Sequence, residues 1–175
     1  SLIRKVLDAG IRTVLIPRVE TVEEVREAVA AARFSHGDEV GDRGIGTARV
    51  GTWGADRVDH ARREDENTFV GVMIENQAAV ANLSEILAVE DLGFAFVGPS
   101  DLSASQGRPL KTDHPDVRAQ IAAVAETVHE SDVALGGIHT GVEAASAAVD
   151  RGYDIVRVGS ELGAIRQHLG GVLSE

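Results

Sequence analysis

Residues 69–101, FVGVMIENQAAVANLSEILAVEDLGFAFVGPSD, contain the pattern that decides the fold. Two runs in this stretch, Phe69 to Glu75 and Phe94 to Gly98, are nearly continuous in apolar residues. Such runs are typical of strands in a parallel sheet that is covered on both faces or closed into a barrel. Between them, Asn76 can cap a helix over Gln77 to Val89. The stretch therefore predicts a strand, a helix and a second strand.

The same alternation extends over the rest of the chain. Three further apolar runs bounded by turn residues predict strands: Thr13 to Arg18, Val133 to Ile138 and Asp154 to Gly159. A helix is expected at Leu2 to Ala9, and three later helix starts carry capping or first-turn residues: Thr21 with Glu24, Thr140 with Glu143, and Pro115. Five strands with intervening helices indicate a parallel α/β protein, either a doubly wound sheet or part of a (β/α)8 barrel.

The barrel is the better of these two folds. A doubly wound nucleotide-binding sheet should show G-x-G-x-x-G after its first strand, where this chain has IPRVE at residues 16–20. A complete (β/α)8 TIM barrel needs about 250 residues. We therefore expect the 175 residues to form one partial barrel domain, residues 1–175, with about five βα units equivalent to strands four to eight. The two open sheet edges of such a piece need cover from elsewhere or from an oligomer.

The composition narrows the possible functions. Asp and Glu number 28 against 17 Lys and Arg, a net charge of −11, which disfavours a nucleic-acid or anionic-membrane partner. Cysteine is absent, which excludes disulfides, thiolate catalysis and cysteine-bound zinc, and no apolar run is long enough to span a membrane. Acidic surplus with few lysines predicts a halophilic, cytoplasmic protein, the alternative being an acidic mesophilic enzyme from a GC-rich genome.

One connection is unusually long. From Ser35 to Asn67 the chain takes about 33 residues to reach the next strand, where a few would be usual. The segment contains Trp53, a charged stretch at Asp59 to Glu66, and Arg43 in a glycine-rich setting. It is expected to form an active-site lid or a subunit contact, with Arg43 contacting substrate or a neighbouring subunit. The alternative is a solvated loop with a short surface helix.

Two carboxylates follow neighbouring predicted strands. In parallel α/β folds the ligand lies at the carboxyl ends of the strands, where Glu75 and Asp101 are expected. Oxygen-only ligation by two acids suits Mg²⁺ or Mn²⁺. The alternative is that each acid caps a helix or pairs with an arginine. The turn at Gly98 to Ser103 can also point its amides at a substrate carboxylate, although such a turn is common.

Five strings in chain order resemble the HpcH/HpaI aldolase family: KVLDAG (5–10), TVLIPRVET (13–21), DRGIG (42–46), VMIEN (72–76) and FVGPSDLSASQG (96–107). The resemblance implies a (β/α)8 barrel, a divalent Mg²⁺ or Mn²⁺ cofactor, and a class II aldolase. Such a lyase cleaves a 4-hydroxy-2-oxo acid to pyruvate and an aldehyde. It also implies a cytoplasmic homo-oligomer, hexameric in the family, in which the exchanged helix corresponds to Ser160 to Leu173.

The resemblance assigns roles to four residues. Glu75 and Asp101 match the metal ligands, and Ser100 matches the position whose backbone amide holds the substrate carboxylate, next to the substrate-binding Asp101. Asp8 matches an acid that orients a catalytic histidine. That histidine and a pyruvate-binding arginine lie upstream of the match to Asp8, so we expect them to be missing and turnover to be impaired. Met73 stands where many relatives have a substrate-contacting glutamine.

Other assignments are weaker. His139 follows a predicted strand and is a candidate substitute base. The Arg18 side chain could neutralise a substrate carboxylate, and the alternative for Arg18 is an ordinary salt bridge. No lysine suits a Schiff base. Two alternative functions stay open. One is cleavage of malyl- or citramalyl-CoA, for which no basic cluster appears. The other is a non-catalytic assembly partner that completes a barrel.

Overall fold

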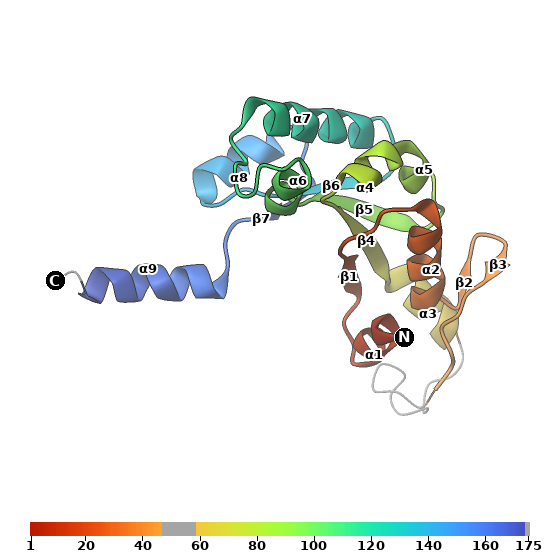
Figure 1. Ribbon diagram of the computed structural model, residues 1–175. Coiled ribbons are helices and arrows are strands. Elements are labelled where there is room, and N and C mark those ends of the chain that lie inside the picture. The colour runs from red at the N-terminus through yellow and green to blue at the C-terminus, as the bar shows by residue number, and fades with distance from the viewer. Residues whose placement is uncertain (47–58, 174–175) are drawn as a thin grey trace.

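The computed structural model describes residues 1–46 and 59–173 (Figure 1). Its main sheet is parallel and curled, with strand order β1-β4-β5-β6-β7. The strands are β1 (Thr13–Ile16), β4 (Phe69–Ile74), β5 (Leu92–Val97), β6 (Ala134–Ile138) and β7 (Ile155–Arg157). All five predicted strands are therefore confirmed, and the sheet is a half-barrel with β1 and β7 at its two edges.

Helices connect the strands, and a short hairpin precedes β4. The helices are α1 (Leu2–Asp8), α2 (Val22–Ala32), α3 (His60–Asn67), α4 (Gln77–Ala81), α5 (Leu83–Leu87), α6 (Pro99–Ser105), α7 (Pro115–His129), α8 (Val142–Val149) and α9 (Glu161–Leu173). The hairpin pairs β2 (Ser35–His36) with β3 (Glu39–Val40). Among the helices of residues 1–46 and 59–173, none combines the length and apolar character needed to cross a membrane.

The helix starts test the capping predictions. The Thr21 and Glu24 capping box forms, Asn76 caps α4, and Pro115 opens α7, as predicted. The prediction for Thr140 is wrong, because Gly141 takes the cap position with φ 87°, a conformation that favours glycine.

The single helix predicted over residues 77–89 is also wrong. Asn82 divides it into α4 and α5, and its side-chain amide donates a 2.7 Å hydrogen bond to the carbonyl of Glu20.

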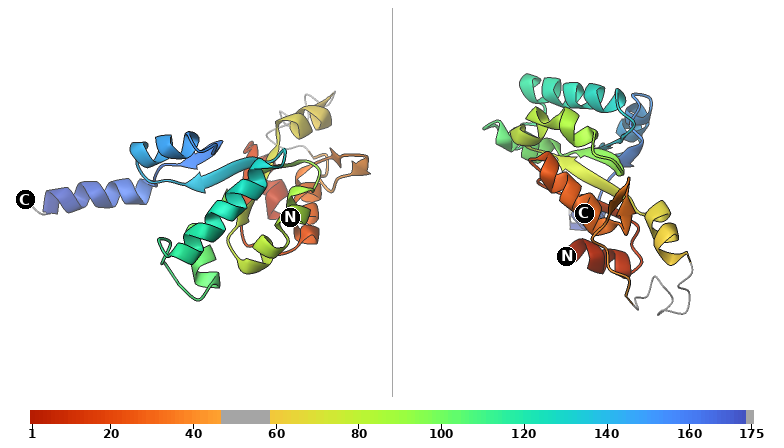
Figure 2. Two further views of the ribbon diagram at one scale, coloured as in Figure 1. Left: turned by 90° about the horizontal axis from the view of Figure 1, so that it is seen from above. Right: turned by 90° about the vertical axis from the view of Figure 1, so that its right-hand side faces the viewer.

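The two faces of the sheet are packed differently. The outer face meets α2, α5 and α7, which Figure 2 shows as one layer of helices. On the inner face, phenylalanine rings fill the space beside glycines, which have no side chain. A Cβ on Gly71 would lie 2.2 Å from Phe94, and one on Gly136 would lie 2.5 Å from Phe96. Because both faces are apolar, the strands read as continuous apolar runs.

The long connection before β4 lies at the amino ends of the strands. The Asp65 carboxylate accepts hydrogen bonds from the backbone N–H groups of Phe34 and Ser35, and Arg33 donates to the carbonyl of Thr68, just before β4. Glu75 lies at the opposite, carboxyl ends of the strands, directly after β4. The described part of the connection, residues 35–46 and 59–67, therefore does not cover Glu75, so the expected active-site lid is wrong for those residues. The expected subunit contact stays a prediction. Trp53 lies outside the described residues.

Candidate active site

The Glu75 side chain lies directly after β4, at the carboxyl end of the sheet. It is buried, and its Oε1 accepts a 2.7 Å hydrogen bond from the backbone N–H of Arg18, which follows β1. Arg18 has φ 58°, a left-handed conformation that costs a non-glycine residue about 1–3 kcal/mol. Such strain concentrates at functional sites. The Arg18 backbone thus holds Glu75, while a role for its side chain toward substrate stays a prediction.

The turn after β5 brings Asp101 to the same edge. β4 and β5 are hydrogen-bonded neighbours, so the residues that follow them lie side by side. A Cβ on Gly98 would lie 2.9 Å from Glu75 Cβ and 3.1 Å from Glu75 Oε2, so only glycine fits there. Asp101 is exposed in the first turn of α6. The structure therefore brings the Glu75 carboxylate against the turn that carries Asp101.

Ser100 and Met73 belong to the same edge. Ser100 precedes Asp101 in the first turn of α6, where backbone N–H groups have no acceptor within the helix. Its carbonyl accepts a 2.7 Å hydrogen bond from the Ser103 hydroxyl. The Met73 sulfur lies 3.2 Å from the position of a Cβ on Gly98, beside Glu75. A thioether, which donates no hydrogen bond, thus lines this edge.

The donor chemistry of this edge fits a hard divalent cation. Carboxylate oxygens are the ligands that Mg²⁺ and Mn²⁺ prefer. Within residues 1–46 and 59–173, Glu75 Oε2 and the Asp101 carboxylate make no hydrogen bond or ion pair, so neither acid is paired with an arginine. The same residues contain no cluster of three or more His, Asp or Glu suited to a metal. Two carboxylates would leave the remaining coordination positions to water and substrate.

Asp8 does not join this edge. It lies at the end of α1, where it pairs with Arg4 at 3.4 Å and approaches Arg43 at 3.9 Å. Arg43 also contacts Thr68, just before β4, so this group lies at the amino ends of the strands. β4 has six residues, and a strand rises about 3.3 Å per residue, which places Glu75 roughly 20 Å away along the strand. The orientation of a histidine by Asp8 stays a prediction.

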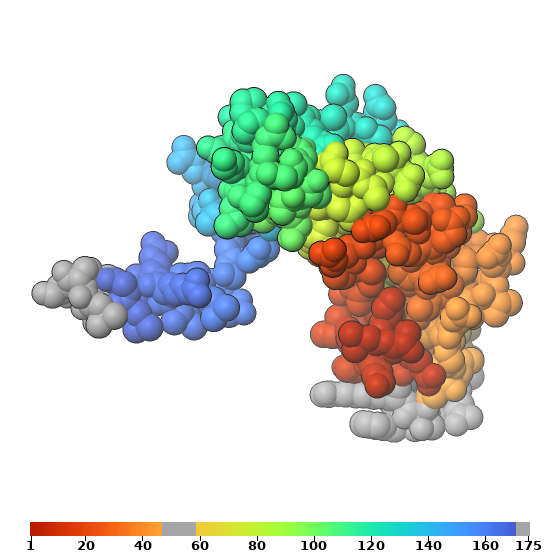
Figure 3. Space-filling view, viewed as in Figure 1, coloured from red at the N-terminus to blue at the C-terminus, as the bar shows by residue number. Residues whose placement is uncertain are grey.

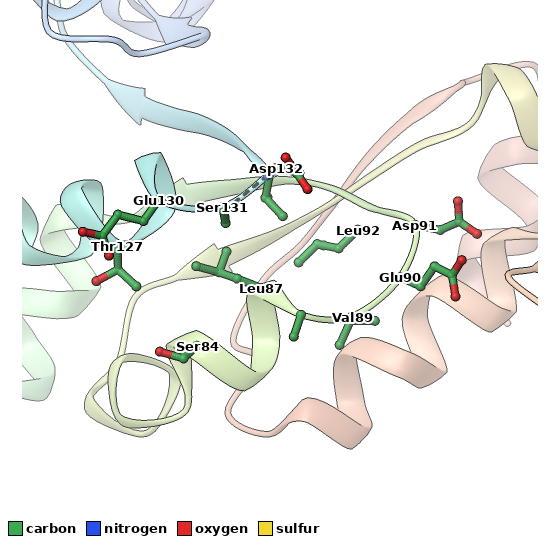
Figure 4. Close-up of a pocket in the computed structure, with 12 residues that line it drawn as sticks. Ser84, Leu87, Val89, Glu90, Asp91, Leu92, Thr127, Glu130, Ser131 and Asp132 are labelled. Carbon is green, nitrogen blue, oxygen red and sulfur yellow. Dashed lines mark hydrogen bonds between the residues drawn. The ribbon is translucent and has the colours of Figure 1, made fainter.

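One cavity among the described residues lies at the amino ends of the strands, away from Glu75. It has a volume of about 710 Å³ and lies where α5 leads into β5 and α7 leads into β6, as Figure 4 shows. Its lining includes Leu92, Val133 and the acids Glu90, Asp91 and Asp132, but neither Glu75 nor Asp101. In barrel folds the amino ends of the strands serve stability. The cavity is therefore separate from the candidate active site.

Comparison with known proteins identifies the family of the chain. The family model for HpcH/HpaI aldolase/citrate lyase matches residues 1–167. The chain belongs to this family. A crystal structure of an HpcH/HpaI aldolase/citrate lyase family protein from Burkholderia cenocepacia J2315 is similar with a TM-score of 0.90 and 30% identity, over 99% of this chain and 68% of that one. The structure of the citrate synthase SbnG is similar with a TM-score of 0.85 and 26% identity, over 98% and 65%.

Sequence relatives agree with the structural ones. The 2-keto-3-deoxy-L-rhamnonate aldolase of Klebsiella pneumoniae is 37% identical over 161 residues, which are 91% of this chain and 59% of that protein. The enzyme of the same name from Salmonella schwarzengrund is 36% identical over 162 residues, with the same coverage. The chain thus spans 59% of the length of these HpcH/HpaI relatives.

Arg43 has a structural role in this family member. Its side chain is buried, donates to Glu64 at 3.2 Å, and lies over the Phe34 ring at 4.9 Å from the centroid. Arg12 donates to the other oxygen of Glu64 at 3.1 Å. These contacts keep Arg43 at the amino ends of the strands, away from Glu75, and its expected contact with substrate or a neighbouring subunit stays a prediction. The sequence did not single out Glu64, because it lies in the charged stretch Asp59 to Glu66, whose composition predicts exposure to solvent.

His139 follows β6 at the carboxyl edge, but its ring turns away from the interior. It packs on Tyr153 with ring centroids 4.6 Å apart and lines a cavity of about 520 Å³ beside α7. Burial, and secondarily the positive charge of Arg151, lower the pKa of His139 from its ordinary value of 6.5. The structure does not bring His139 to Glu75, so the geometry gives no support to its predicted role as a substitute base.

The lowered pKa of His139 predicts a pH dependence of stability. The unfolded chain binds this proton more readily than the folded chain, so the stabilising contribution is complete above the ordinary pKa. It is lost as the pH falls through the folded-state pKa. Wild type should therefore lose more unfolding free energy between about pH 8 and pH 5 than His139→Gln, whose side chain does not titrate. Urea unfolding at both pH values measures the difference, and equal losses would refute the expectation.

Proposed function

We propose that Glu75 and Asp101 bind one Mg²⁺ or Mn²⁺ ion, and that the chain forms the metal-binding part of a class II pyruvate aldolase. Such a carbon-carbon lyase converts a 4-hydroxy-2-oxo acid to pyruvate and an aldehyde. One observation carries the proposal. The buried Glu75 carboxylate is held by the Arg18 backbone against the turn of Asp101, and its Oε2 makes no hydrogen bond or ion pair among the described residues.

The residues of this edge have distinct tasks in that reaction. Glu75 and Asp101 would hold the cation, which when bound stabilises the negative charge of a pyruvate enolate. The backbone N–H of Ser100 would bind the substrate carboxylate. Met73 would offer an apolar contact and no hydrogen bond beside Glu75. The names of the Klebsiella and Salmonella relatives support a sugar-derived 2-oxo acid as the substrate class.

The sheet edges at β1 and β7 support a proposal about assembly. We propose that the five strands correspond to the last five of a (β/α)8 barrel, and that the chain forms a homo-oligomer. Helix α9 projects from the rest of the molecule (Figure 3). Three apolar side chains on it are more than half exposed: Leu162, Ile165 and Leu169. Their spacing of three and four residues is that of one helix face, which supports α9 as a contact between subunits.

Exchange of the pyruvate methyl protons in D₂O tests the proposed function. No described residue at this edge is assigned as a base, so solvent would take the proton. With Mg²⁺ or Mn²⁺, proton NMR should therefore show exchange only modestly faster than in protein-free buffer with the same metal. The excess should vanish in EDTA and in Glu75→Gln. Titration with oxalate, an analogue of the pyruvate enolate, adds a readout that needs no proton transfer. If oxalate binding is absent or indifferent to EDTA and no metal-dependent exchange occurs, the proposed function is wrong.

A further inference from the structure

Three glutamine side chains link three helices near the proposed cation site. Gln120 in α7 accepts a hydrogen bond at Oε1 from Nε2 of Gln77, at 2.8 Å, and another from Nε2 of Gln106. Its own Nε2 donates back to Oε1 of Gln77 at 3.1 Å. Gln77 is the first residue of α4, and Gln106 is the C-cap of α6. A single side chain of α7 therefore joins α4 to α6.

Helix α4 follows Glu75, and helix α6 carries Asp101. Gln77 comes two residues after Glu75, and Gln106 comes five residues after Asp101. α4 has five residues and α6 has seven, so neither is long enough to be stable alone, and contacts to neighbours must fix its orientation. The strand pairing fixes where the two helices begin, and contacts between the helices fix how they are oriented, so the placement of Asp101 relative to Glu75 depends on both.

Two other side-chain hydrogen bonds near the proposed ligands hold each half separately. On the Glu75 side, Asn76 donates from its side chain to the carbonyl of Val19 at 3.0 Å, which ties the start of α4 to the loop after β1. On the Asp101 side, Arg108 donates to Asp116 at 2.7 Å, which ties the loop after α6 to the start of α7. These side-chain contacts stay within one half. The backbone N–H of Gly98 donates to the Ile74 carbonyl at 3.0 Å and joins the ends of the two strands, whereas the hydrogen bonds of Gln120 join the helices that follow those strands.

We propose that Gln120 is a positioning residue that fixes the separation of Glu75 and Asp101 and thereby the affinity for the divalent cation. This inference rests on the proposed function. Gln120 does not reach the cation; it acts through Gln77 and Gln106. A glutamine suits the task because its amide combines an acceptor for both neighbours with a donor for Gln77. Removal of a direct hydrogen-bond partner of a metal ligand typically changes metal affinity by about 10- to 100-fold, and Gln120, one contact further out, is expected at the lower end of that range.

Mn²⁺ affinity, read from the EPR signal of free Mn²⁺, tests the inference on the full chain. Gln120→Ala should bind Mn²⁺ about tenfold more weakly than wild type. Gln120→Glu keeps an acceptor for both Gln77 and Gln106 and should return to within about threefold of wild type. Gln167→Ala, on the exposed surface of α9, is the matched control and should bind as wild type does.

The outcomes separate the two claims. If wild type binds no Mn²⁺, or Glu75→Gln binds as tightly as wild type, the proposed site is wrong and the role of Gln120 is overturned with it. If wild type binds through Glu75 but Gln120→Ala binds equally well, only the role of Gln120 is wrong. A loss in Gln120→Ala that Gln120→Glu does not restore also overturns it. Should Gln120→Ala fail to fold by circular dichroism, Gln106→Ala removes one arm of the link and takes its place.

Discussion

Replacing Glu64 by alanine is expected to lower the free energy of unfolding by about 3–5 kcal/mol, because it leaves a buried charge without its partner. The side chains of Glu64 and Arg43 are 5% and 1% exposed, and they are paired at 3.2 Å. Without Glu64, the guanidinium of Arg43 keeps the Asp8 carboxylate at 3.9 Å and the face of the Phe34 ring. Neither contact replaces a hydrogen-bonded carboxylate.

Urea unfolding of wild type and two variants measures this effect. Glu66→Ala is the matched control, since Glu66 lies on the same helix and its pair with Arg62 is exposed on both sides. Exposed pairs contribute little to stability, so the control should unfold nearly as wild type does. A loss in Glu64→Ala no larger than in Glu66→Ala would show that the buried pair does not hold α3 against the amino ends of the strands.

Replacing Glu75 by glutamine is expected to weaken Mn²⁺ binding by about 100-fold or more. The substitution keeps the size of the side chain and an acceptor for the N–H of Arg18, but it removes the negative charge that a cation requires. Loss of an outer partner of a metal ligand already costs about 10- to 100-fold, so loss of the ligand should cost at least as much. The fold should be unaffected, because the 2.7 Å hydrogen bond from Arg18 can still form.

Isothermal titration with Mn²⁺ gives the affinity, and Glu85→Gln provides the control. Glu85 is exposed on α5, and its replacement by glutamine removes the same charge from the molecule without touching the site. This comparison separates direct ligation from the general effect of a net charge of −11 on any cation. Equal losses in the two variants would mean that Glu75 acts only through the overall field of the protein.

Much of the fold followed from local pattern. The strands could be predicted because both faces of the sheet are apolar, and parallel connections bring the carboxyl ends of neighbouring strands to one edge. That topology is why Glu75 and Asp101 could be placed together without a structure. Their surroundings could not be predicted in the same way. The hydrogen bond from Arg18 depends on a left-handed backbone, and the close approach of Gly98 depends on the register between strands.

The predictions that failed did so for physical reasons. His139 follows a strand, as predicted, but alternation along β6 decides which face of the sheet its ring takes. The ring lies on the outer face, the same face as Leu135. Glu64 lies among charges that suggest exposure, and only the packing of α3 against the sheet shows that it is buried. The division of the helix at Asn82 follows from a side-chain bond to Glu20, a contact across 62 positions of sequence. Tertiary contacts decided each of these cases.

The central claim is that Glu75 and Asp101 hold the same cation, and a double-mutant cycle in Mn²⁺ affinity tests it most directly. Wild type should bind one Mn²⁺ per chain, and Glu75→Gln and Asp101→Asn should each bind it far more weakly. If both residues contact one ion, the losses should not add, and the double variant should be little worse than the weaker single variant. Strictly additive losses, or an Asp101→Asn variant that binds Mn²⁺ as tightly as wild type, would contradict a shared site.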